Sequence, residues 1–489
     1  MAIWCYYGKK GLAFLGVFLG FSAVVFGQPQ KSLKPAVYMG LQAGASAGNT
    51  TPFWLRANDY GQFPDAPNFV QSDLNLRQDY DSLFQKNSAL KPFSMGYGTQ
   101  VIVQQSNQTR LIMPEAFIKL RYKHWELYVG RKKEIFGLTD TTHTSGSCIW
   151  SGNALPMPKI QIHTPKYVAI GKKGRISFNA GISHGWFGKD SLVQGHWLHQ
   201  KWLYGRIGKP ESKVQVTAGI NHQVMWGGYS DLLEDGSQYT VTIDGQLAPY
   251  PLYSYQYIIL PFLQKFTPPD PSKVPGYDGG LAVGNQLGSV DISFQYKGEM
   301  TLWLLYKQQP YDFARSLYNL NNIEDGLHGL SVSFINGQFL RNITGEFFYS
   351  KSQGRYRFGK YQESNYGEVD NYFFHGQYQS WSYQNQILGT PFIFFEGQNQ
   401  KRFNNNRLKY YYLSLKGKLK PKLSYTLKQV YSQNFGTYSR SIDLSQYSGS
   451  LQLIYQAGSS LISGQFMMDQ GRLYDQNIGL SLSWQRQLY

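Results

Sequence analysis

Apolar and polar residues alternate one by one along much of this chain, and tight polar turns interrupt the alternation. In one stretch, Val290, Ile292 and Phe294 are separated by the polar residues Asp291 and Ser293. A period of two places the apolar side chains on one face of a β-strand. Tight turns that join such strands into hairpins are predicted at Lys123-His124, Lys172-Lys173-Gly174, Lys209-Pro210-Glu211, Lys297-Gly298-Glu299, Asn336-Gly337, Lys420-Pro421-Lys422 and Ala457-Gly458. The pattern therefore predicts an all-β protein built from consecutive antiparallel hairpins.

The other connections are long, and they fall at 132–165, 183–200, 222–288, 308–327, 351–407 and 435–448. Short turns at one end and long loops at the other are typical of a transmembrane antiparallel β-barrel of the bacterial outer membrane, in which the long loops are extracellular. Together with strands predicted near 37–45, 72–80, 96–105, 461–469 and 477–487, these hairpins give about 18 strands, and an even number leaves both chain ends periplasmic. The loops 222–288 and 351–407 either plug the lumen or reach outward, and the pattern leaves both possibilities open.

The composition agrees with a membrane barrel better than with other classes. Charged residues make up 16% of the 489 residues and aromatic residues another 16%, whereas a typical soluble domain has about 25% charged residues. The mean hydropathy of −0.40 excludes a bundle of transmembrane helices, and the abundance of aromatics excludes intrinsic disorder. A barrel needs only every second strand residue to be apolar. A soluble secreted β-sandwich is the alternative architecture, but it would expose too much apolar surface.

The N-terminal segment has the pattern of a cleaved secretory signal. Lys9 and Lys10 precede an apolar run over 11–26, and small residues surround Gly27. A basic start, a short apolar run and a small-residue cleavage site together mark such signals. We therefore expect cleavage after Gly27, which removes residues 1–27; a single membrane-spanning helix is the alternative.

The rest of the chain, 28–489, is then the outer-membrane barrel with its plug and extracellular loops. It ends in an aromatic residue, Tyr489, and a terminal aromatic resembles the signal that barrel-assembly machinery recognises. The expected location is the bacterial outer membrane, and the expected biogenesis partner is that machinery.

Signatures of catalysis and of metal binding are missing. The chain contains no H-E-x-x-H zinc pair and no phosphate-binding P-loop. Its nine histidines show no metal-ligand spacing. We therefore expect no enzyme activity, no catalytic residue, no cofactor and no metal. A hydrolase or acyltransferase site at the outer rim is a further alternative, because spacing alone would not reveal it.

The chain is basic, with 47 Lys and Arg against 30 Asp and Glu and a formal net charge of +17. A positive lumen would attract anionic solutes, so the alternative function is an outer-membrane porin or channel for small solutes, with a preference for anions. Lysines in the periplasmic turns explain part of the same excess. Nucleic acid is a poor partner, because the basic residues are spread over many turns. Alternation predicts inward positions for Arg206, Arg341, Lys416, Lys418 and Lys428.

More specific signals lie in the predicted outer loops. Four blocks occur in order: Gly130-Arg131, Phe136-Gly137 and Ser151-Gly152-Asn153-Ala154-Leu155-Pro156-Met157-Pro158; 221–228, with His222 and Trp226; Asn321-Asn322 with Asp325-Gly326-Leu327; and 371–391, with His375, Tyr378 and Trp381. These blocks in this order resemble the Wzi-type capsule assembly family of outer-membrane barrels. The resemblance covers most of the chain from about residue 37 onward.

The resemblance implies a monomeric barrel that binds and anchors exported capsular polysaccharide or exopolysaccharide at the cell surface, as a lectin and not as an enzyme. Its expected partners are that polysaccharide and the lipid and lipopolysaccharide of the outer membrane. Sugars bind to aromatic faces and to polar groups that meet their hydroxyls, and Arg pairs with acidic groups. The candidate polysaccharide-binding residues are therefore Arg131, Trp150, Asn153, His222, Trp226, Asp325, His375, Tyr378 and Trp381.

Each candidate also has a purely structural interpretation. Tyr and Trp form girdles at both membrane interfaces of such barrels. Asn, Asp and Gly set turn geometry, and a loop histidine is more often a hydrogen-bonded structural residue than a ligand. No motif of the family fixes the sugar contacts in this sequence, so the candidates rest on their loop positions and their chemistry.

Overall fold

A computed structural model of the chain describes residues 35–80, 93–188, 192–233, 241–276, 282–312, 322–354, 371–375, 377–396 and 403–488. The predicted signal segment 1–27, its cleavage site and Tyr489 lie outside the described residues.

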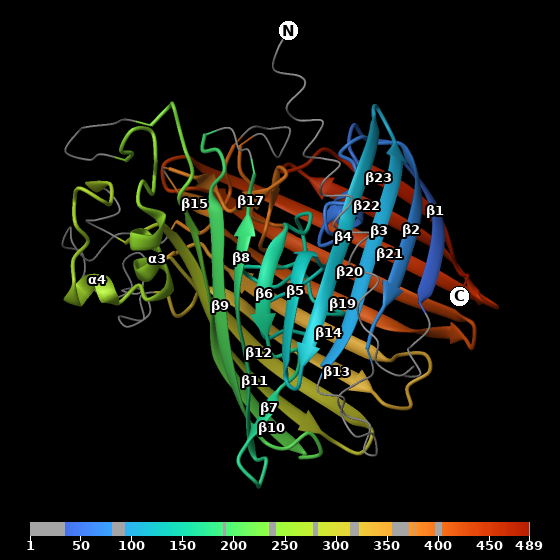
Figure 1. The fold of residues 1–489 in the computed structure, drawn as a ribbon. Helices are drawn as coiled ribbons and strands as arrows, with labels where there is room; N and C mark the ends of the chain where they lie inside the picture. Colours follow the sequence, from blue (N-terminus) through green and yellow to red (C-terminus); the bar gives the residue numbers. More distant parts are fainter. Residues whose placement is uncertain are drawn as a thin grey trace, which may run out of the picture.

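Nineteen strands form one antiparallel sheet that closes into a barrel (Figure 1). Strand β1 (Ala36–Ser46) pairs with β2 on one side and with the last strand, β23 (Asn477–Gln487), on the other. Strands β6 (Lys159–His163) and β7 (Val168–Ile170) both pair with β8 (Ile176–Trp186). They share one place in the wall, so the described residues form 18 strand positions, which confirms the predicted barrel.

The remaining wall strands follow one another in chain order: β2 (Phe69–Gln78), β3 (Phe93–Gln105), β4 (Thr109–Tyr122), β5 (Trp125–Arg131), β9 (Trp197–Ile207), β10 (Val214–Trp226), β11 (Asn285–Lys297), β12 (Thr301–Tyr311), β13 (Gly326–Phe334), β14 (Asn342–Tyr349), β19 (Leu408–Lys420), β20 (Leu423–Gly436), β21 (Ser441–Ala457) and β22 (Ser460–Gly471). Six of the seven predicted tight turns join neighbouring strands of this series, and the seventh, at Lys172-Lys173-Gly174, joins β7 to β8. Because β1 begins and β23 ends at the same end of the barrel as these turns, that end is periplasmic.

Some connections differ from the sequence-based expectation because the strands are longer than predicted. The segment 435–448 is mostly strand, since β20 and β21 extend to a four-residue connection, 437–440, which the Thr437 N to Arg440 O hydrogen bond closes. Strand β6 lies inside the predicted loop 132–165. Likewise β10 and β11 take up both ends of the predicted loop 222–288, so its connection is 227–284.

The outer face of the wall is apolar. On β23, Ile478, Leu480 and Leu482 are 51%, 51% and 59% exposed, whereas the alternating Ser481 is 3% exposed. A belt of exposed apolar side chains on alternating positions is the surface that lipid covers in outer-membrane barrels. None of the helices in the described part of the chain is long and apolar enough to cross a membrane.

The predicted inward cations are only partly inside the barrel. Arg206 lies with its guanidinium 4.2 Å from the Tyr167 ring centre, and Lys416 belongs to the inward series of β19. The Lys428 ammonium lies 5.1 Å from the Trp54 ring centre. The other two lie at the periplasmic end: Lys418 continues the inward series of β19 and donates to Pro421 O of the adjoining turn, whereas Arg341 precedes β14 and donates to Gly337 O of its turn.

Three segments fold into the barrel from its extracellular end, and we call them together the plug. They are 51–65, with helix α2 (Phe53–Arg56); 132–158; and 371–396, with the two-residue strands β15 (Phe374–His375), β16 (Gln379–Ser380), β17 (Ser382–Tyr383) and β18 (Gln386–Ile387). A fourth connection, 227–284, contains helices α3 (Pro251–Ile259) and α4 (Leu263–Phe266). Figure 1 shows these helices outside the wall, beside β9.

Candidate functional site

The three plug segments hold one another through backbone hydrogen bonds. Tyr60 N donates to Gly152 O at 2.7 Å, Ser151 N to Leu388 O at 2.9 Å, and Thr390 N to Cys148 O at 3.0 Å. The middle segment, 132–158, is thus bonded to both of the others. The plug is therefore one folded unit, although its parts are separated by hundreds of residues in the sequence.

Aromatic side chains fasten the plug to the inner wall. Phe136 packs against Trp202 of β9 with ring centres 4.8 Å apart, and Phe392 packs against Tyr410 of β19 at 4.1 Å. On the opposite side Trp54 donates through Nε1 to Ser448 O of β21 at 2.9 Å. These rings are nearly fully buried and belong to one continuous core cluster. The lumen at this level is filled by packed side chains.

Buried carboxylates of the wall add polar contacts to the plug. Glu346 on β14 accepts hydrogen bonds from Thr144 Oγ1 at 2.6 Å and from Ser145 N at 2.7 Å. Asp291 on β11 accepts from Leu138 N at 3.1 Å and from Tyr204 of β9 at 2.9 Å. A backbone N–H needs a partner when it is buried, so these inward acids fix the path of the plug.

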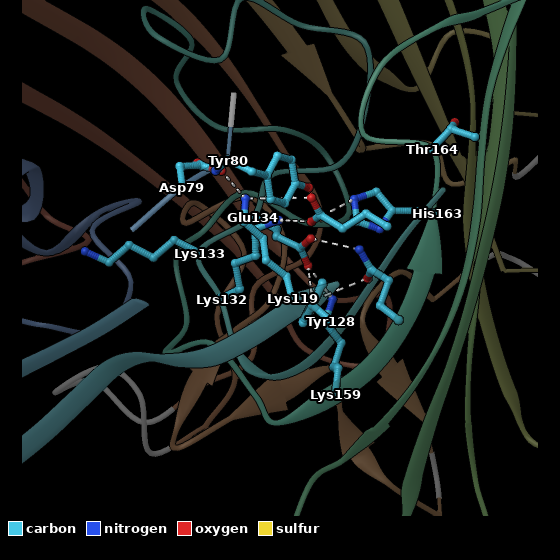
Figure 2. A network of polar contacts seen from close by, with 12 residues as sticks. Asp79, Tyr80, Lys119, Tyr128, Lys132, Lys133, Glu134, Lys159, His163 and Thr164 are labelled. Atoms are coloured by element: carbon cyan, nitrogen blue, oxygen red, sulfur yellow. Dashed lines mark hydrogen bonds and ion pairs between the residues drawn. The ribbon is translucent and has the colours of Figure 1, made fainter. Parts of the chain in front are cut away.

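An ion-pair network links the plug to strands β5 and β6 (Figure 2). Glu134 of the plug lies 2.8 Å from Lys159 Nζ, and it also accepts from Tyr128 at 2.6 Å and from Gln161 at 2.9 Å. Burial alone would raise the pKa of the Glu134 carboxyl, but Lys159 and Lys132 outweigh burial and lower this pKa to about 2. Glu134 is therefore ionised and fully hydrogen-bonded at neutral pH.

The network continues toward the periplasmic end of β4. Glu126 lies 3.2 Å from Lys132 Nζ and 3.7 Å from Lys119 Nζ. Lys119 also forms a 2.7 Å ion pair with Asp79 and lies 4.3 Å from the centre of the Tyr80 ring (Figure 2). Acids and bases alternate here, and each has a partner. These ion pairs stabilise the contact between the plug and the wall, and their lysines lie on the inner side of the barrel.

The extracellular side of the plug has a small polar recess that all three plug segments build. Its volume is about 70 Å³, and its lining includes Arg56, Asp65, Asn153, Asn385, Gln386, Phe53, Phe394 and Tyr474. Tyr474 comes from the connection between β22 and β23, so the recess lies at the extracellular end. We call it the plug pocket.

The polar groups of the plug pocket differ in how firmly they are held. Arg56 forms a 2.5 Å ion pair with Asp65, whose side chain is 76% exposed at the mouth. Asn385 is exposed at the tip of the β17–β18 hairpin, where it has a left-handed backbone with φ of +62°. The Tyr474 ring stacks on Phe53 with ring centres 5.9 Å apart. The pocket thus combines exposed hydrogen-bonding groups with fixed aromatic rings.

Several of the predicted polysaccharide-binding residues lie in or beside the plug. Asn153 lines the plug pocket, but its Nδ2 donates to Ile387 O at 3.0 Å inside the plug. Trp150 is 6% exposed and lies under the Lys159 ammonium, 4.8 Å from its ring centre. Arg131 donates to the Tyr383 hydroxyl at 3.0 Å.

The candidates of the fourth block are also plug residues. Trp381 and Tyr378 are each 1% exposed, and the Tyr378 hydroxyl donates to Gly227 O at 3.2 Å. His375 lies in β15, with its ring centre 5.9 Å from that of Tyr378. Asp325, from the third block and outside the plug segments, is fully buried and accepts from the Tyr372 hydroxyl of the plug at 2.8 Å. These four side chains brace the plug in the described conformation, and contact with saccharide stays a prediction.

His222 and Trp226 lie elsewhere, because both point to the outer face of β10. His222 Nδ1 is 3.0 Å from the Tyr311 hydroxyl, and Trp226 stacks on Tyr255 of α3 with ring centres 5.3 Å apart. The structure therefore does not bring these two together with the other candidates. Four residues of the plug pocket that sequence reasoning missed are Arg56, Asp65, Asn385 and Tyr474, since no motif or periodicity marks them.

Among the described residues no group of three His, Cys, Asp or Glu side chains is arranged to hold a metal ion. The only cysteine they contain, Cys148, is buried in the plug, and burial raises the pKa of its thiol well above the usual value. A thiol held protonated in this way is a poor nucleophile.

Comparison with known proteins bears on the fold. No family model and no curated protein sequence matches the chain. Its structure is similar to that of Wzi, an outer-membrane protein involved in group 1 capsule assembly in Escherichia coli and described as a carbohydrate-binding β-barrel. The TM-score is 0.53 at 13% identity, over 91% of this chain and 83% of that one.

Channel proteins give weaker matches. OccD3 (OpdP) of Pseudomonas aeruginosa matches with a TM-score of 0.43 at 10% identity, over 94% and 95% of the two chains. An anion-selective porin from Comamonas acidovorans matches at 0.37 and 9%, over 93% and 100%. Likeness at such identities shows the fold alone. The chain has the fold of an outer-membrane β-barrel.

Proposed function

We propose that this protein is a plugged outer-membrane barrel that binds exported capsular polysaccharide or exopolysaccharide at the cell surface and anchors it there without catalysis. The observation that carries the proposal is the plug pocket, a recess of aromatic and hydrogen-bonding side chains at the extracellular end of a filled lumen. The fold likeness to a carbohydrate-binding barrel supports the same conclusion.

The pocket has the chemistry that saccharides require. Sugar rings present apolar C–H faces, which pack on aromatic rings, and hydroxyls, which bond to amide, carboxylate and guanidinium groups. Tyr474 supplies a ring, and Asn385 and Asp65 supply exposed polar atoms. A recess of about 70 Å³ would hold one end or one substituent of a saccharide, while the rest of the polymer lies across the extracellular surface.

The exposed amide of Asn385 offers a direct test. Replacing Asn385 by Gly keeps the left-handed backbone (φ +62°) and removes only the side chain. We expect polysaccharide binding to weaken about 2- to 10-fold, the loss of one hydrogen bond worth about 0.5–1.5 kcal/mol. The measurement is the affinity of the purified protein for exopolysaccharide isolated from the source bacterium.

The matched control is Gln384→Gly, at the neighbouring exposed hairpin position with a φ of +51° that does not line the pocket. It should leave the affinity unchanged. Equal affinities of the parent and both variants would show that the plug pocket takes no part in binding.

A channel that prefers small anionic solutes is the second candidate. Lysines on the inner wall, Lys119 and Lys159 among them, favour it, because a positive lumen concentrates anions. Monomeric state, contact with lipopolysaccharide and recognition by barrel-assembly machinery are further parts of the proposal that rest on the sequence.

Single-channel recording separates the two candidates. Because plug side chains pack against the wall from β3 to β22, we expect the refolded protein to be silent, or to open rarely, in a planar bilayer. Steady, large conductance would mean an open path beside the plug, and the channel would then replace polysaccharide anchoring as the proposed function.

A further inference from the structure

Part of the connection between β10 and β11 does not stay at the extracellular rim. It turns down along the outside of the barrel, where α3 and α4 lie beside β9 (Figure 1). Tyr257 and Ile258 of α3 are buried in a cluster with Val224 and Trp226, two outward-pointing residues of β10. The helix pair is therefore packed on the face of the wall that elsewhere meets lipid.

The wall beneath α3 is unusually polar. On β9, Leu203 and Ile207 are outward and 55% and 64% exposed, so alternation places Lys201 and His199 on the same outward face. A lipid belt of about 25 Å corresponds to about ten residues of a strand that rises about 3.3 Å per residue at a tilt of about 40°. Counted from Ile207 upward, such a belt reaches Trp197. Both polar residues thus lie at membrane height.

Helix α3 neutralises these polar groups. Lys201 Nζ donates to the carbonyls of Ile258, at 3.0 Å, and Ile259, which form the C-terminal end of the helix. The C-terminal end of a helix carries partial negative charge and suits a cation. Tyr255 meets His199 Nδ1 at 3.2 Å. These specific contacts hold the helix against the wall.

The outer side of the helix pair exposes large apolar side chains, beside the polar Gln256 and the charged Lys265. Helix α3 contains no charged residue, and Leu252, on the side away from the wall, is 92% exposed. Phe262 and Phe266, which follow it, are 58% and 79% exposed. Large apolar side chains that are exposed away from the wall favour an apolar environment on that side too. Leu203, an exposed residue of the lipid-facing belt, lies on the same outward face of β9 as Lys201, which contacts α3.

We propose that the α3–α4 unit is embedded in the outer leaflet of the membrane, with Leu252, Phe262 and Phe266 among the acyl chains of the lipid. The unit covers His199 and Lys201 of β9 in place of lipid. Its own outer side then faces the lipid. The inference rests on the outer wall alone and does not depend on what the plug pocket binds.

Depth-dependent fluorescence quenching tests this position. The full chain with Phe266→Cys, labelled with a small environment-sensitive fluorophore, is reconstituted in phosphatidylcholine vesicles that contain acyl-brominated phosphatidylcholine. We expect strong quenching by the brominated lipid and little by aqueous iodide. The substitution is at a 79% exposed position, so folding is not at risk. Both chains carry the additional substitution Cys5→Ser, and the chain with Phe266 intact measures background labelling, which the burial of Cys148 keeps low.

Two control positions calibrate the result. Ile292→Cys lies on the outward face of β11 at 52% exposure and should be quenched by lipid, whereas Asn107→Cys lies in the exposed turn between β3 and β4 and should be quenched by iodide. A Phe266 label that behaves like the Asn107 label would overturn the proposal. Protection from both quenchers, with cysteine cross-linking between two chains, would also overturn it and would assign the surface to a second copy.

Discussion

Replacing Leu413 by Arg is expected to destabilise the folded barrel by about 2–4 kcal/mol, the cost of a lipid-facing cation near the middle of the membrane. Leu413 lies in the centre of β19, opposite Gly345 and Gln429 of its two neighbours, and is 40% exposed on the outer face. Because Leu413 is on the outer face, its replacement changes the contact with lipid and does not alter the plug. The measurement is the free energy of unfolding by guanidinium in lipid vesicles.

The matched control is Leu419→Arg, near the periplasmic end of the same strand and 48% exposed. The cost of a cation falls to about 0–1 kcal/mol near the membrane interface, so this variant should unfold almost like the parent. Equal losses at the two positions, or no loss at either, would contradict the proposed orientation of β19 in the membrane.

Replacing Lys159 by Met is expected to cost about 3–5 kcal/mol, because it leaves the buried carboxylate of Glu134 without its closest cation. The two side chains are 2% and 12% exposed and 2.8 Å apart. The second substitution Glu134→Gln should recover much of this loss. It removes the uncompensated charge and keeps an amide that Tyr128 and Gln161 can bond.

The parent protein should also lose part of its stability in acid. The pKa of Glu134 falls from an ordinary 4.5 to about 2 in the folded state, so the unfolded chain takes up a proton first as the pH drops. The stabilisation from this carboxylate is complete above about pH 5 and is lost as the pH falls toward 2. Unfolding free energies measured across this range should show the loss in the parent but not in Glu134→Gln. An identical acid profile for both would show that the ion pair contributes nothing.

The wall of the barrel could be predicted from the sequence because its signal is local. In β11 and β12 every second side chain faces lipid, and the turn between them is tight and polar, so a short window of sequence contains the whole pattern. Strand ends were less predictable. The hydrogen-bond ladder of β20 and β21 continues past the membrane, where no apolar requirement marks the residues.

The plug pocket could not be predicted in the same way, because its residues meet only after the barrel closes. Arg56, Asn385 and Tyr474 come from three distant segments, and none of them follows a periodic pattern. Alternation does place His199 and Lys201 on the lipid side of β9. It does not reveal that a helix from the next connection covers them, since that contact depends on the path of a long loop.

The first plug segment also constrains the order in which this protein can fold. Phe53 N bonds to Asp469 of β22, 416 residues later, and Trp54 to Ser448 of β21, 394 residues later. Contacts of such long sequence separation form late, because their loop-closure entropy must be overcome first. These two contacts of the segment form only when the last hairpins are in place beside β1. Docking of this segment and sealing of the β1–β23 seam are thus coupled steps, and a chain that lacks its last two strands would have an open wall and would lose the bond from Phe53 N to Asp469.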